Sequence, residues 1–326
     1  MSPKTVVITG ASAGVGRATA IAFAKEGANV ALIARGKEGL ESTRLEVESY
    51  GHKALIFIID VSDSAQIELA ANQIVQAWGS IDIWVNNAMV SVFSPFKEMT
   101  SEEFRKVTEV TYLGVVYGTK AALKHMLSRN SGIIVQVGST LAYRGIPLQS
   151  AYCGAKHAIK GFTESLRCEL MHDGSNIKIT MVQLPALNTP QFTWTKSRMP
   201  FKPQPVSPIF QPEIAAKGIV WVTHHYRREL KIGFLTTLII FLNSFFPGLG
   251  DLYLAKTGYK SQQTKEPDDH KRPFNLWEPV AKDLGTHGSF DKISNVRSLQ
   301  LWIVMHGIWF KILSLIILGL LFIFFI

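Results

Sequence analysis

A β-branched run, a glycine-rich turn and a helical pattern follow one another at the start of this 326-residue chain. Residues 5–9 (TVVIT) are apolar and β-branched, as a strand buried in a parallel sheet requires. The turn TGASAGVG (9–16) then leads into a helical pattern over Val15–Lys25. Glycines let the backbone approach a pyrophosphate, and a helix N-terminus offers free N–H groups to it. This order predicts the opening of a dinucleotide-binding βαβ unit; a tight turn without a ligand is the alternative.

The second expected strand, Asn29–Ala34, ends where the adenosine ribose of a dinucleotide would lie. An acidic residue there would hydrogen-bond the 2′-hydroxyl of NAD, but this chain has Ala34 followed by Arg35. A guanidinium pairs with a 2′-phosphate through two parallel hydrogen bonds. The sequence therefore favours NADP over NAD, and an ordinary solvated arginine is the alternative.

Polar residues follow three further expected strands. Residues 54–59 lead to Asp60-Val61, residues 81–85 to Asn86-Asn87-Ala88, and residues 132–137 to Ser139. Sites in open α/β sheets lie outside the carboxyl ends of the strands, so we expect these side chains to share one crevice. Each short turn taken alone is equally typical of a helix cap.

Ser139, Tyr152 and Lys156 carry the chemistry expected of this crevice. Tyr152 and Lys156 are four residues apart and would share one face of a helix. A nearby ammonium favours phenolate, so we expect Lys156 to lower the pKa of Tyr152 from about 10 toward the range of an acid–base catalyst.

With these motifs the chain closely resembles the short-chain dehydrogenase/reductase family, in its non-extended branch. The resemblance rests on residues 9–16, Asp60, NNA (86–88), Ser139 and the run from Tyr152 to Lys156, and it covers residues 3–233. It implies a Rossmann-type α/β domain with a doubly wound parallel sheet, a nicotinamide cofactor, and hydride transfer between an alcohol and a carbonyl compound.

The resemblance also implies roles for individual residues. Tyr152 would be the general acid or base, Lys156 would hold the nicotinamide ribose, and Ser139 would hydrogen-bond the reacting oxygen. Thr189 would reach the nicotinamide carboxamide, and Asp60 and Val61 would flank the adenine. The full set expected at the nucleotide is Gly10, Ser12, Ala13, Gly14, Val15, Gly16, Arg35, Asp60, Val61, Asn87, Ala88, Tyr152, Lys156 and Thr189.

Three residues depart from the family pattern. Met89 stands where a glycine is usual, and Ala186 replaces the glycine of a Pro-Gly pair. Thr111 aligns with the asparagine that completes the usual catalytic tetrad, whose backbone positions a water in the proton relay. Thr111 keeps a backbone carbonyl and a short polar side chain, so we retain it as a catalytic candidate.

The segment Ala186–Pro212 is rich in proline and irregular, and it corresponds to the family's substrate lid. Its apolar side chains favour a hydrophobic substrate or a membrane contact; packing on the domain is the alternative. These side chains are Phe192, Trp194, Met199, Phe201 and Phe210. A helix over Pro212–Tyr226 and a strand over Glu229–Gly233 would complete a catalytic domain spanning residues 1–234.

An appendage follows over residues 235–300. Residues 232–250 carry no charge and are interrupted by Asn243 and Pro247. They favour an interfacial or substrate-covering helix over a bilayer span or a dimer contact. Residues 256–298 are polar, with glycine, proline and mixed charges, which is typical of a surface loop or linker.

The last segment predicts a membrane anchor over residues 301–326. Ile308–Ile326 contains one charge, Lys311, and as a helix it would reach about 28 Å, close to a hydrocarbon core of roughly 30 Å. Trp302 and Trp309 suit an aromatic belt, and Lys292 and Arg297 precede the helix. We therefore expect a single-pass C-terminal anchor with the catalytic domain facing the cytoplasm.

Charge and cysteine content limit the partners. A net charge of +9 without an aromatic-basic reading surface favours anionic lipid over nucleic acid, and solvated surface lysines are the alternative. The two cysteines, Cys153 and Cys168, have no metal-type spacing, so we expect free thiols and no metal.

The sequence thus predicts a membrane-anchored oxidoreductase that prefers NADP(H) and interconverts a hydrophobic alcohol and its ketone or other carbonyl form. A membrane-bound nucleotide-sensing or scaffold protein with little catalysis is the alternative, supported by Thr111, Met89 and Ala186. An isomerase or dehydratase using the Tyr152–Lys156 pair is a third hypothesis. A homo-oligomer is left open.

Overall fold

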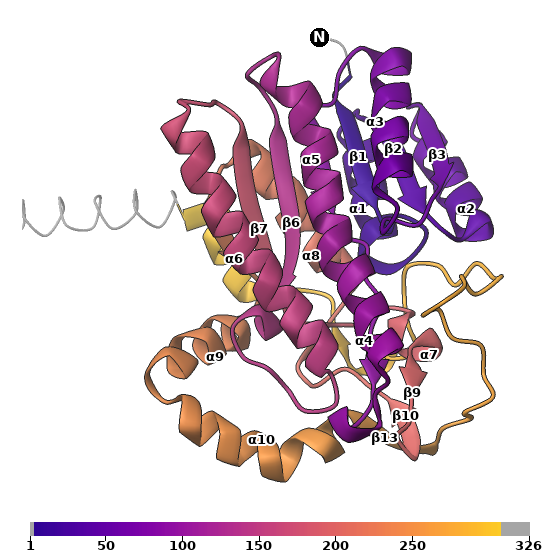
Figure 1. Ribbon diagram of the computed structural model, residues 1–326, viewed down its shortest axis with the longest axis vertical. Coiled ribbons are helices and arrows are strands. Elements are labelled where there is room, and N and C mark those ends of the chain that lie inside the picture. Colours follow the sequence, from indigo (N-terminus) through magenta and orange to yellow (C-terminus); the bar gives the residue numbers. More distant parts are fainter. Residues whose placement is uncertain (1–2, 308–326) are drawn as a thin grey trace, which may run out of the picture.

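A seven-stranded parallel sheet forms the centre of the computed structural model, which describes residues 3–307 (Figure 1). Its strand order is β12-β7-β6-β4-β1-β2-β3. The bounds are β1 (Thr5–Thr9), β2 (Asn29–Ala34), β3 (Ala54–Ile58), β4 (Ile83–Asn86), β6 (Ile133–Ser139), β7 (Lys178–Leu184) and β12 (Glu229–Lys231). The chain passes from β3 back across β1 to β4, so the sheet changes direction between β1 and β4, where α/β proteins place their ligands.

Helices cover both faces of this sheet. One face packs against α1 (Gly14–Lys25), α2 (Lys37–Glu48) and α8 (Pro212–His224). The other packs against α3 (Ser64–Trp78), α4 (Ser101–Thr108), α5 (Gly114–Leu127) and α6 (Ser150–His172). Phe23 and Leu32 lie in the first core, and Trp84 and Ile67 in the second. The predicted doubly wound α/β fold is confirmed.

Strand β7 was not placed from the sequence. Its residues after Lys178 are all buried, and it lies between β6 and the short edge strand β12. Thr180 and Gln183 interrupt its apolar run, yet both are fully buried within the sheet. The strand matters for the site because its carboxyl end delivers the segment that starts at Pro185.

The predicted lid consists of short elements beyond the ends of the strands. These are β8 (Ala186–Leu187), α7 (Gln191–Trp194), β9 (Lys196–Ser197), β10 (Phe201–Pro203) and β11 (Ile209–Phe210). Strand β9 pairs with β5 (Val92–Phe93), and β11 pairs with both β8 and β14 (Ser294–Asn295). The lid is therefore tied to the domain by backbone pairing at several points.

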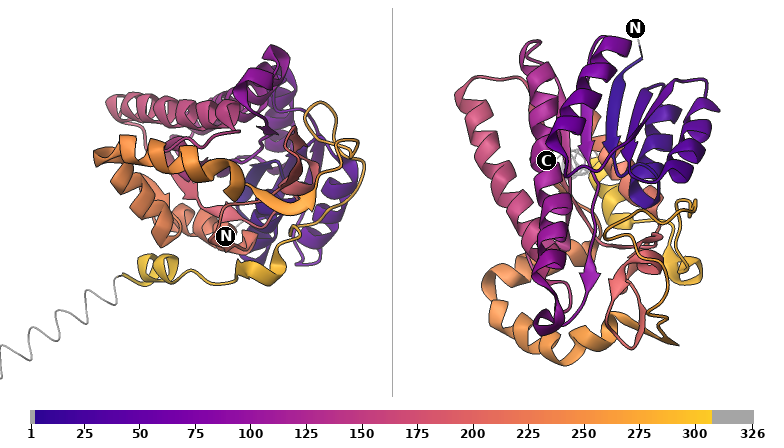
Figure 2. Two further views of the ribbon diagram at one scale, coloured as in Figure 1. Left: turned by 90° about the horizontal axis from the view of Figure 1, so that it is seen from below. Right: turned by 45° about the vertical axis from the view of Figure 1, so that its right-hand side comes forward.

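The appendage begins with a helical hairpin, defined here as residues 234–261. It comprises α9 (Phe234–Phe245) and α10 (Pro247–Ser261), and it lies at the bottom of the molecule as drawn (Figure 1). Proline at the first position of α10 ends α9 and turns the chain. The view from below shows the hairpin running along the side of the domain under α6 (Figure 2).

The polar segment 256–298, expected to be a surface loop or linker, has no helix or strand over residues 268–290 but begins with regular structure. Residues up to Ser261 continue α10, and β13 (Gln263–Pro267) pairs antiparallel with β10 of the lid. Residues 275–291, named the strap from here on, lie against the domain. Its backbone hydrogen bonds hold it there: Asn275 N donates to Trp194 O at 2.9 Å, and Gly288 N to Asn188 O at 3.2 Å.

No helix within residues 3–307 is long and apolar enough to cross a membrane. The hairpin helices that cover the uncharged run 232–250 are 12 and 15 residues long. Of the predicted anchor over residues 301–326, the structure describes 301–307, and Ile308–Ile326 lies outside the described residues.

Candidate active site

Two pockets lie side by side at the carboxyl ends of the strands. The larger has a volume of about 530 Å³ and the smaller about 180 Å³. Both contain residues predicted to bind a dinucleotide or to act on its substrate. Five residues line both pockets and so mark the boundary between them: Val15, Asn87, Met89, Thr189 and Gln191.

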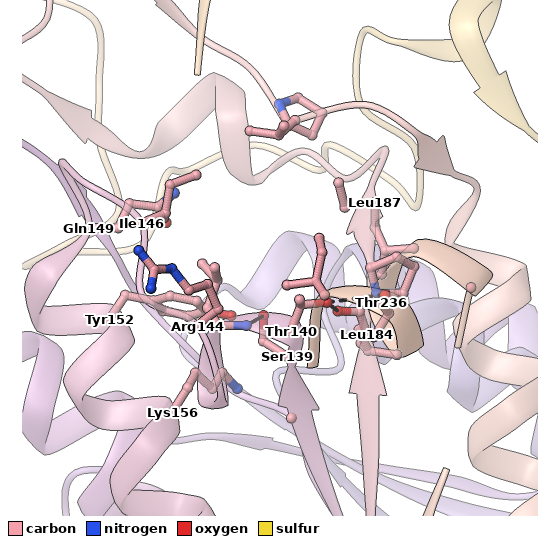
Figure 3. A pocket seen from close by; sticks show the side chains of 18 of the residues that line it. Ser139, Thr140, Arg144, Ile146, Gln149, Tyr152, Lys156, Leu184, Leu187 and Thr236 are labelled. Atoms are coloured by element: carbon pink, nitrogen blue, oxygen red, sulfur yellow. Dashed lines mark hydrogen bonds between the residues drawn. The ribbon is translucent and has the colours of Figure 1, made fainter. Parts of the chain in front are cut away.

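Ser139, Tyr152 and Lys156 lie together on one wall of the larger pocket (Figure 3). Ser139 ends β6, and Tyr152 and Lys156 stand on successive turns of α6. The Lys156 ammonium lies 5.5 Å from the centre of the Tyr152 ring and donates to the Val137 carbonyl at 2.7 Å. The predicted constellation is therefore assembled, with its hydroxyls at a cavity that a small molecule can enter.

The pKa of Tyr152 does not follow the prediction. Burial raises this pKa above its ordinary value, and a hydrogen bond with Ser139 only partly opposes the rise. Burial also lowers the pKa of Lys156 to about 8. We expected the ammonium to lower the phenol's pKa, but it is directed to the Val137 carbonyl, and loss of solvent is the larger effect. Tyr152 therefore holds its proton at neutral pH, as a proton donor to a carbonyl oxygen must.

Thr111 lines neither pocket, although its neighbours Val90 and Val110 line the smaller one. It is fully buried in a π-helical turn, Glu109–Leu113, between α4 and α5. Its hydroxyl donates to Val90 O at 2.9 Å and accepts from Val90 N at 3.1 Å. The Thr111 side chain is thus bound to the backbone of Val90, in the loop between β4 and β5, and the expectation of a catalytic role remains only for the Thr111 backbone. Such π-turns are frequent at functional sites.

The glycine turn is shaped as a phosphate cradle needs. Gly10 and Gly14 have φ of 68° and 55°, which favour glycine. A Cβ on Gly16 would lie 2.1 Å from the Gly10 carbonyl oxygen, so no larger residue fits there. Asn87 fixes the turn from β4, because its backbone N donates to Thr9 Oγ1 at 2.9 Å and its amide to Thr9 O at 3.0 Å.

Most residues expected at the nucleotide meet at the smaller pocket. They line its walls from four different strand ends, and Gly16 packs directly beneath the turn. The lining residues among them are Gly10, Ser12, Ala13, Gly14, Val15, Arg35, Asp60, Val61, Asn87, Ala88 and Thr189. Because this cradle combines glycines, a helix N-terminus and side-chain donors, the residues present fit a nicotinamide dinucleotide.

Asp60 is held as a carboxylate in the smaller pocket. Although burial opposes ionisation, hydrogen bonds from Lys106 at 2.7 Å and from the backbone of Ser62 at 3.0 Å keep the pKa of Asp60 below its usual value. Arg35 lies 3.6 Å from the same carboxylate. The smaller pocket therefore holds a fixed negative charge with a cation beside it.

Arg35 is engaged in a way that the sequence did not indicate. Its Nη1 donates to Trp277 O at 2.7 Å, and its Nη2 donates to Asn275 O. Burial lowers the pKa of Arg35 from its ordinary value. The guanidinium that was expected to face a 2′-phosphate thus holds the strap in place.

The strap itself supplies pocket residues that sequence reasoning missed. They lie more than two hundred residues after the glycine turn, in a stretch whose polar composition indicates only a loop. These residues are Asn275, Pro279, Val280, Lys282 and Leu284, and Trp194 of the lid lies beside them. No motif or periodicity in the sequence marks them.

The larger pocket is walled mainly by apolar side chains from the lid and the hairpin. Phe192 and Phe210 of the lid line it, as do Leu235, Ile239, Tyr253 and Leu254 of the hairpin. Trp194 faces the smaller pocket instead, Met199 is buried, and Phe201 is 40% exposed. The lid prediction thus holds for two of its five apolar side chains at the larger pocket.

Arg144 joins the hairpin to the loop that precedes Tyr152. Its Nη2 donates to Asp251 Oδ1 at 2.6 Å, and its Nη1 donates to Asn243 Oδ1 at 3.1 Å and Pro247 O at 3.0 Å. Arg144 also lines the larger pocket (Figure 3). One side chain therefore couples the position of the hairpin to the catalytic wall.

Both cysteines are free thiols, with Cys153 buried and Cys168 exposed. Within residues 3–307, no group of histidine, cysteine and acidic side chains could hold a metal ion.

Comparison with known proteins gives consistent matches. A short chain dehydrogenase family model matches residues 4–199. The "uncharacterized oxidoreductase YxnA" of Bacillus subtilis (strain 168) is 33% identical over 280 residues, 85% of this chain and 79% of the relative. The 3-dehydrosphinganine reductase of Danio rerio is 33% identical over 223 residues, 66% and 67% of the two chains. The solved structure of levodione reductase has a TM-score of 0.62 at 28% identity, covering 70% and 95%.

Proposed function

The chain belongs to the short-chain dehydrogenase family of NAD(P)-dependent oxidoreductases, and on that basis we propose that it is a membrane-anchored, NADP(H)-preferring enzyme that interconverts a hydrophobic alcohol and its carbonyl compound. One observation carries the proposal: the hydroxyls of Ser139 and Tyr152 face a cavity of about 530 Å³ whose opposite walls are apolar. This volume lies within the usual range for small-molecule sites, roughly 300–1,000 Å³.

The roles of the residues follow from their positions. Ser139 donates a hydrogen bond to the oxygen of a bound carbonyl group, and Tyr152 gives that oxygen its proton as the alcohol forms. Lys156 stabilises the negative charge that develops on Tyr152, and in the oxidising direction Tyr152 takes the proton back. A bound nicotinamide supplies or accepts the hydride. Donors fixed in a water-poor pocket contribute about 3–4 kcal/mol each in comparable sites.

Two features support a preference for NADP(H). Strand β2 ends in Ala34 and Arg35, so no carboxylate stands where the 2′-hydroxyl of NAD would be recognised. The same pocket holds the cations Arg35 and Lys282. Positive charge at this end of the pocket favours a ligand with an additional phosphate.

The hairpin surface supports a lipid environment. Seven of its large apolar side chains are 57–71% exposed, on a helical pair that also forms one wall of the substrate pocket. They are Phe234, Phe241, Phe245, Phe246, Leu249, Leu252 and Tyr253. Exposed apolar patches of this kind mark membrane or protein contacts, and Lys256 and Lys260 on α10 are placed to meet anionic lipid.

The proposed anchor is Ile308–Ile326, with the catalytic domain on the cytoplasmic side. Together with the hairpin it would hold the pocket at the membrane surface. A substrate dissolved in the bilayer, such as a lipid, sterol or long-chain carbonyl compound, would then reach Tyr152 without crossing water. The 3-dehydrosphinganine reductase among the relatives is named for a lipid substrate of this kind.

The catalytic part of the proposal is tested with Tyr152→Phe. In membrane-reconstituted protein with NADPH and a panel of apolar ketones, we expect turnover to fall by about 10²–10⁴-fold, the usual contribution of a positioned acid. Tyr253→Phe is the matched control, because it removes a hydroxyl from the mouth of the same pocket. Unchanged turnover in Tyr152→Phe would refute the mechanism, and nucleotide binding without turnover on any substrate would favour the scaffold alternative.

The membrane part is tested by flotation with anionic liposomes. Ile317→Lys places a charge within the expected span, at a cost of about 3 kcal/mol, and should convert carbonate-resistant attachment into peripheral binding. Phe241→Ser with Phe245→Ser should then remove the residual binding. Leu45→Ser with Leu69→Ser is the control pair, since both leucines are similarly exposed elsewhere on the domain. Attachment that survives all of these substitutions contradicts the proposal.

A further inference from the structure

The strap forms the outer wall of the nucleotide pocket although it lies outside the stretch matched by the family model. Three contacts fix it at the glycine turn, at α1 and at the start of α2. The Gly14 N–H donates to Gly285 O at 3.1 Å, and Arg17 Nη1 donates to Asp283 Oδ1 at 2.6 Å. Pro279 packs beside Gly36, the residue that follows Arg35. In Figure 1 the strap runs below β1–β3 and α2, where the nucleotide-binding strand ends lie.

A second set of contacts fixes the far end of the strap at the lid. Buried Asn188 donates to Asp291 Oδ1 at 2.8 Å and accepts from Phe290 N at 3.0 Å. Asn188 directly precedes Thr189, which lines both pockets. The strap is thus held near one end by Gly14 of the pocket and at the other by Asn188, the neighbour of the pocket residue Thr189, which distinguishes it from a loosely attached loop.

These contacts change the role expected of Arg35. Both terminal nitrogens of its guanidinium donate to strap carbonyls, those of Asn275 and Trp277. A guanidinium recognises phosphate best when its parallel N–H groups are free to form a two-bonded fork. In Arg35 these N–H groups already donate to strap carbonyls, so the main effect of the Arg35 side chain is to position the strap.

Lys282 is the strap's own cation at this pocket. It lines the pocket together with Arg35 and Asp60. Within residues 3–307 its ammonium forms no ion pair or hydrogen bond, and its side chain is exposed. Of the other charges nearby, Asp283 pairs with Arg17, Asp60 pairs with Lys106, and Arg35 binds the strap backbone. The Glu278 carboxylate of the strap also acts electrostatically on Arg35. An ammonium on a flexible stem suits contact with a phosphate at the pocket edge.

We propose that the strap is part of the nucleotide site and that Lys282 is the residue that recognises the 2′-phosphate of NADP(H), with Arg35 as the positioning residue that places it. This inference rests on the proposed preference for NADP(H). Specificity for the phosphate would then come from the appendage, and the Rossmann-type domain would supply the contacts that NADP and NAD share.

The test compares dissociation constants of the full chain for NADPH and NADH, measured by quenching of protein fluorescence. We expect Lys282→Gln to raise the constant for NADPH about tenfold and to leave that for NADH unchanged, because a contact with a phosphate typically contributes one charge-assisted hydrogen bond. Lys282→Arg should restore most of the loss. Lys265→Gln is the matched control, since it removes the same charge from an exposed position of the appendage away from both pockets.

Arg35→Gln separates the two roles. If Arg35 places the strap, both dissociation constants rise in parallel, and hydrogen exchange within residues 275–291 increases. Loss of the NADPH preference in Arg35→Gln alone, with Lys282→Gln like the unmodified protein, would overturn the inference and assign the phosphate to Arg35. Equal constants for NADPH and NADH in the unmodified protein would instead refute the proposed NADP(H) preference, and the inference with it.

Discussion

The two pockets meet at Thr189 and Met89, yet they are built from different kinds of structure. Regular strand ends and a glycine turn form three sides of the nucleotide pocket, and backbone geometry decides what fits there. The substrate pocket has one regular wall, β6 and α6, and its remaining walls come from the lid and the hairpin. The difference explains how a common dinucleotide site can serve a substrate specific to this chain: the variable elements carry specificity, on a rigid scaffold.

The comparison predicts that a small change in the glycine turn has a large effect. A Cβ at Gly16 would lie 2.1 Å from Gly10 O and 2.7 Å from Asn87 Nδ2, and backbone can give way only by distorting the turn. Overpacking of this kind costs about 1–3 kcal/mol, so Gly16→Ala should weaken NADPH binding by up to about 100-fold in a fluorescence titration.

Gly161→Ala provides the control for this substitution. Gly161 lies within α6, and a Cβ there would meet nothing within 4 Å. Thermal unfolding should show a gain of about 0.5–1 kcal/mol from the better helix former, with nucleotide binding unchanged. If Gly16→Ala binds NADPH as well as Gly161→Ala does, the nucleotide pocket is not set by backbone geometry.

The pH dependence of ketone reduction tests the regular wall of the substrate pocket, which carries Tyr152 and Lys156. Lys156 has its pKa lowered by burial to about 8, so its ammonium is lost as the pH rises through that value. Because the ammonium stabilises the charge that develops on Tyr152, log kcat/KM for ketone reduction should fall above about pH 8 with a slope approaching one decade per pH unit. A profile that stays level to pH 10, with NADPH binding constant across the range, would show that Lys156 does not act through its charge.

The same direction gives a stability prediction for Lys156. Since its folded pKa is below the unfolded value of about 10.4, the unfolded chain binds more protons between these two values. The contribution of this residue to the free energy of unfolding therefore increases with pH across that window. Reduction should thus slow while the fold is not weakened by this group, and circular dichroism at the same pH values separates loss of catalysis from unfolding.

How far the sequence could predict each pocket depends on whether the signal is local. The glycine turn, the strand ends and the four-residue spacing of Tyr152 and Lys156 are short-range patterns with one physical meaning each, and the structure brings them together. The direction of the Tyr152 pKa shift could not be read in this way. It depends on how deeply the folded chain buries the side chain, which the spacing of Tyr152 and Lys156 does not show.

The strap and β7 are two further features that local sequence patterns did not reveal. Strand β7 contains the buried polar residues Thr180 and Gln183, so the apolar pattern expected of a buried strand is weak. Its position in the sheet is set by pairing with β6 and β12. The strap has charges, prolines and glycines throughout, and only its contacts with Arg17, Arg35 and Asn188 reveal that it is ordered against the domain. Such long-range contacts leave no periodicity in the sequence.

The smallest effect is expected where the hairpin meets the catalytic wall. Arg144→Met keeps an apolar stem in the pocket but removes the bonds to Asp251, Asn243 and Pro247 O. Loosening of the hairpin should cost substrate binding about 1 kcal/mol, a roughly fivefold rise in KM for an apolar ketone.

In this variant the dissociation constant for NADPH should stay unchanged, because Arg144 does not line the nucleotide pocket. Arg129→Met is the control, since it removes an arginine paired at 2.9 Å with Asp82 at the amino-terminal edge of the sheet. A parallel loss of ketone and NADPH affinity in Arg144→Met would mean that the hairpin shapes both pockets. The nucleotide pocket could then no longer be described as a rigid scaffold that is independent of the variable walls of the substrate pocket, because Arg144 would act on both.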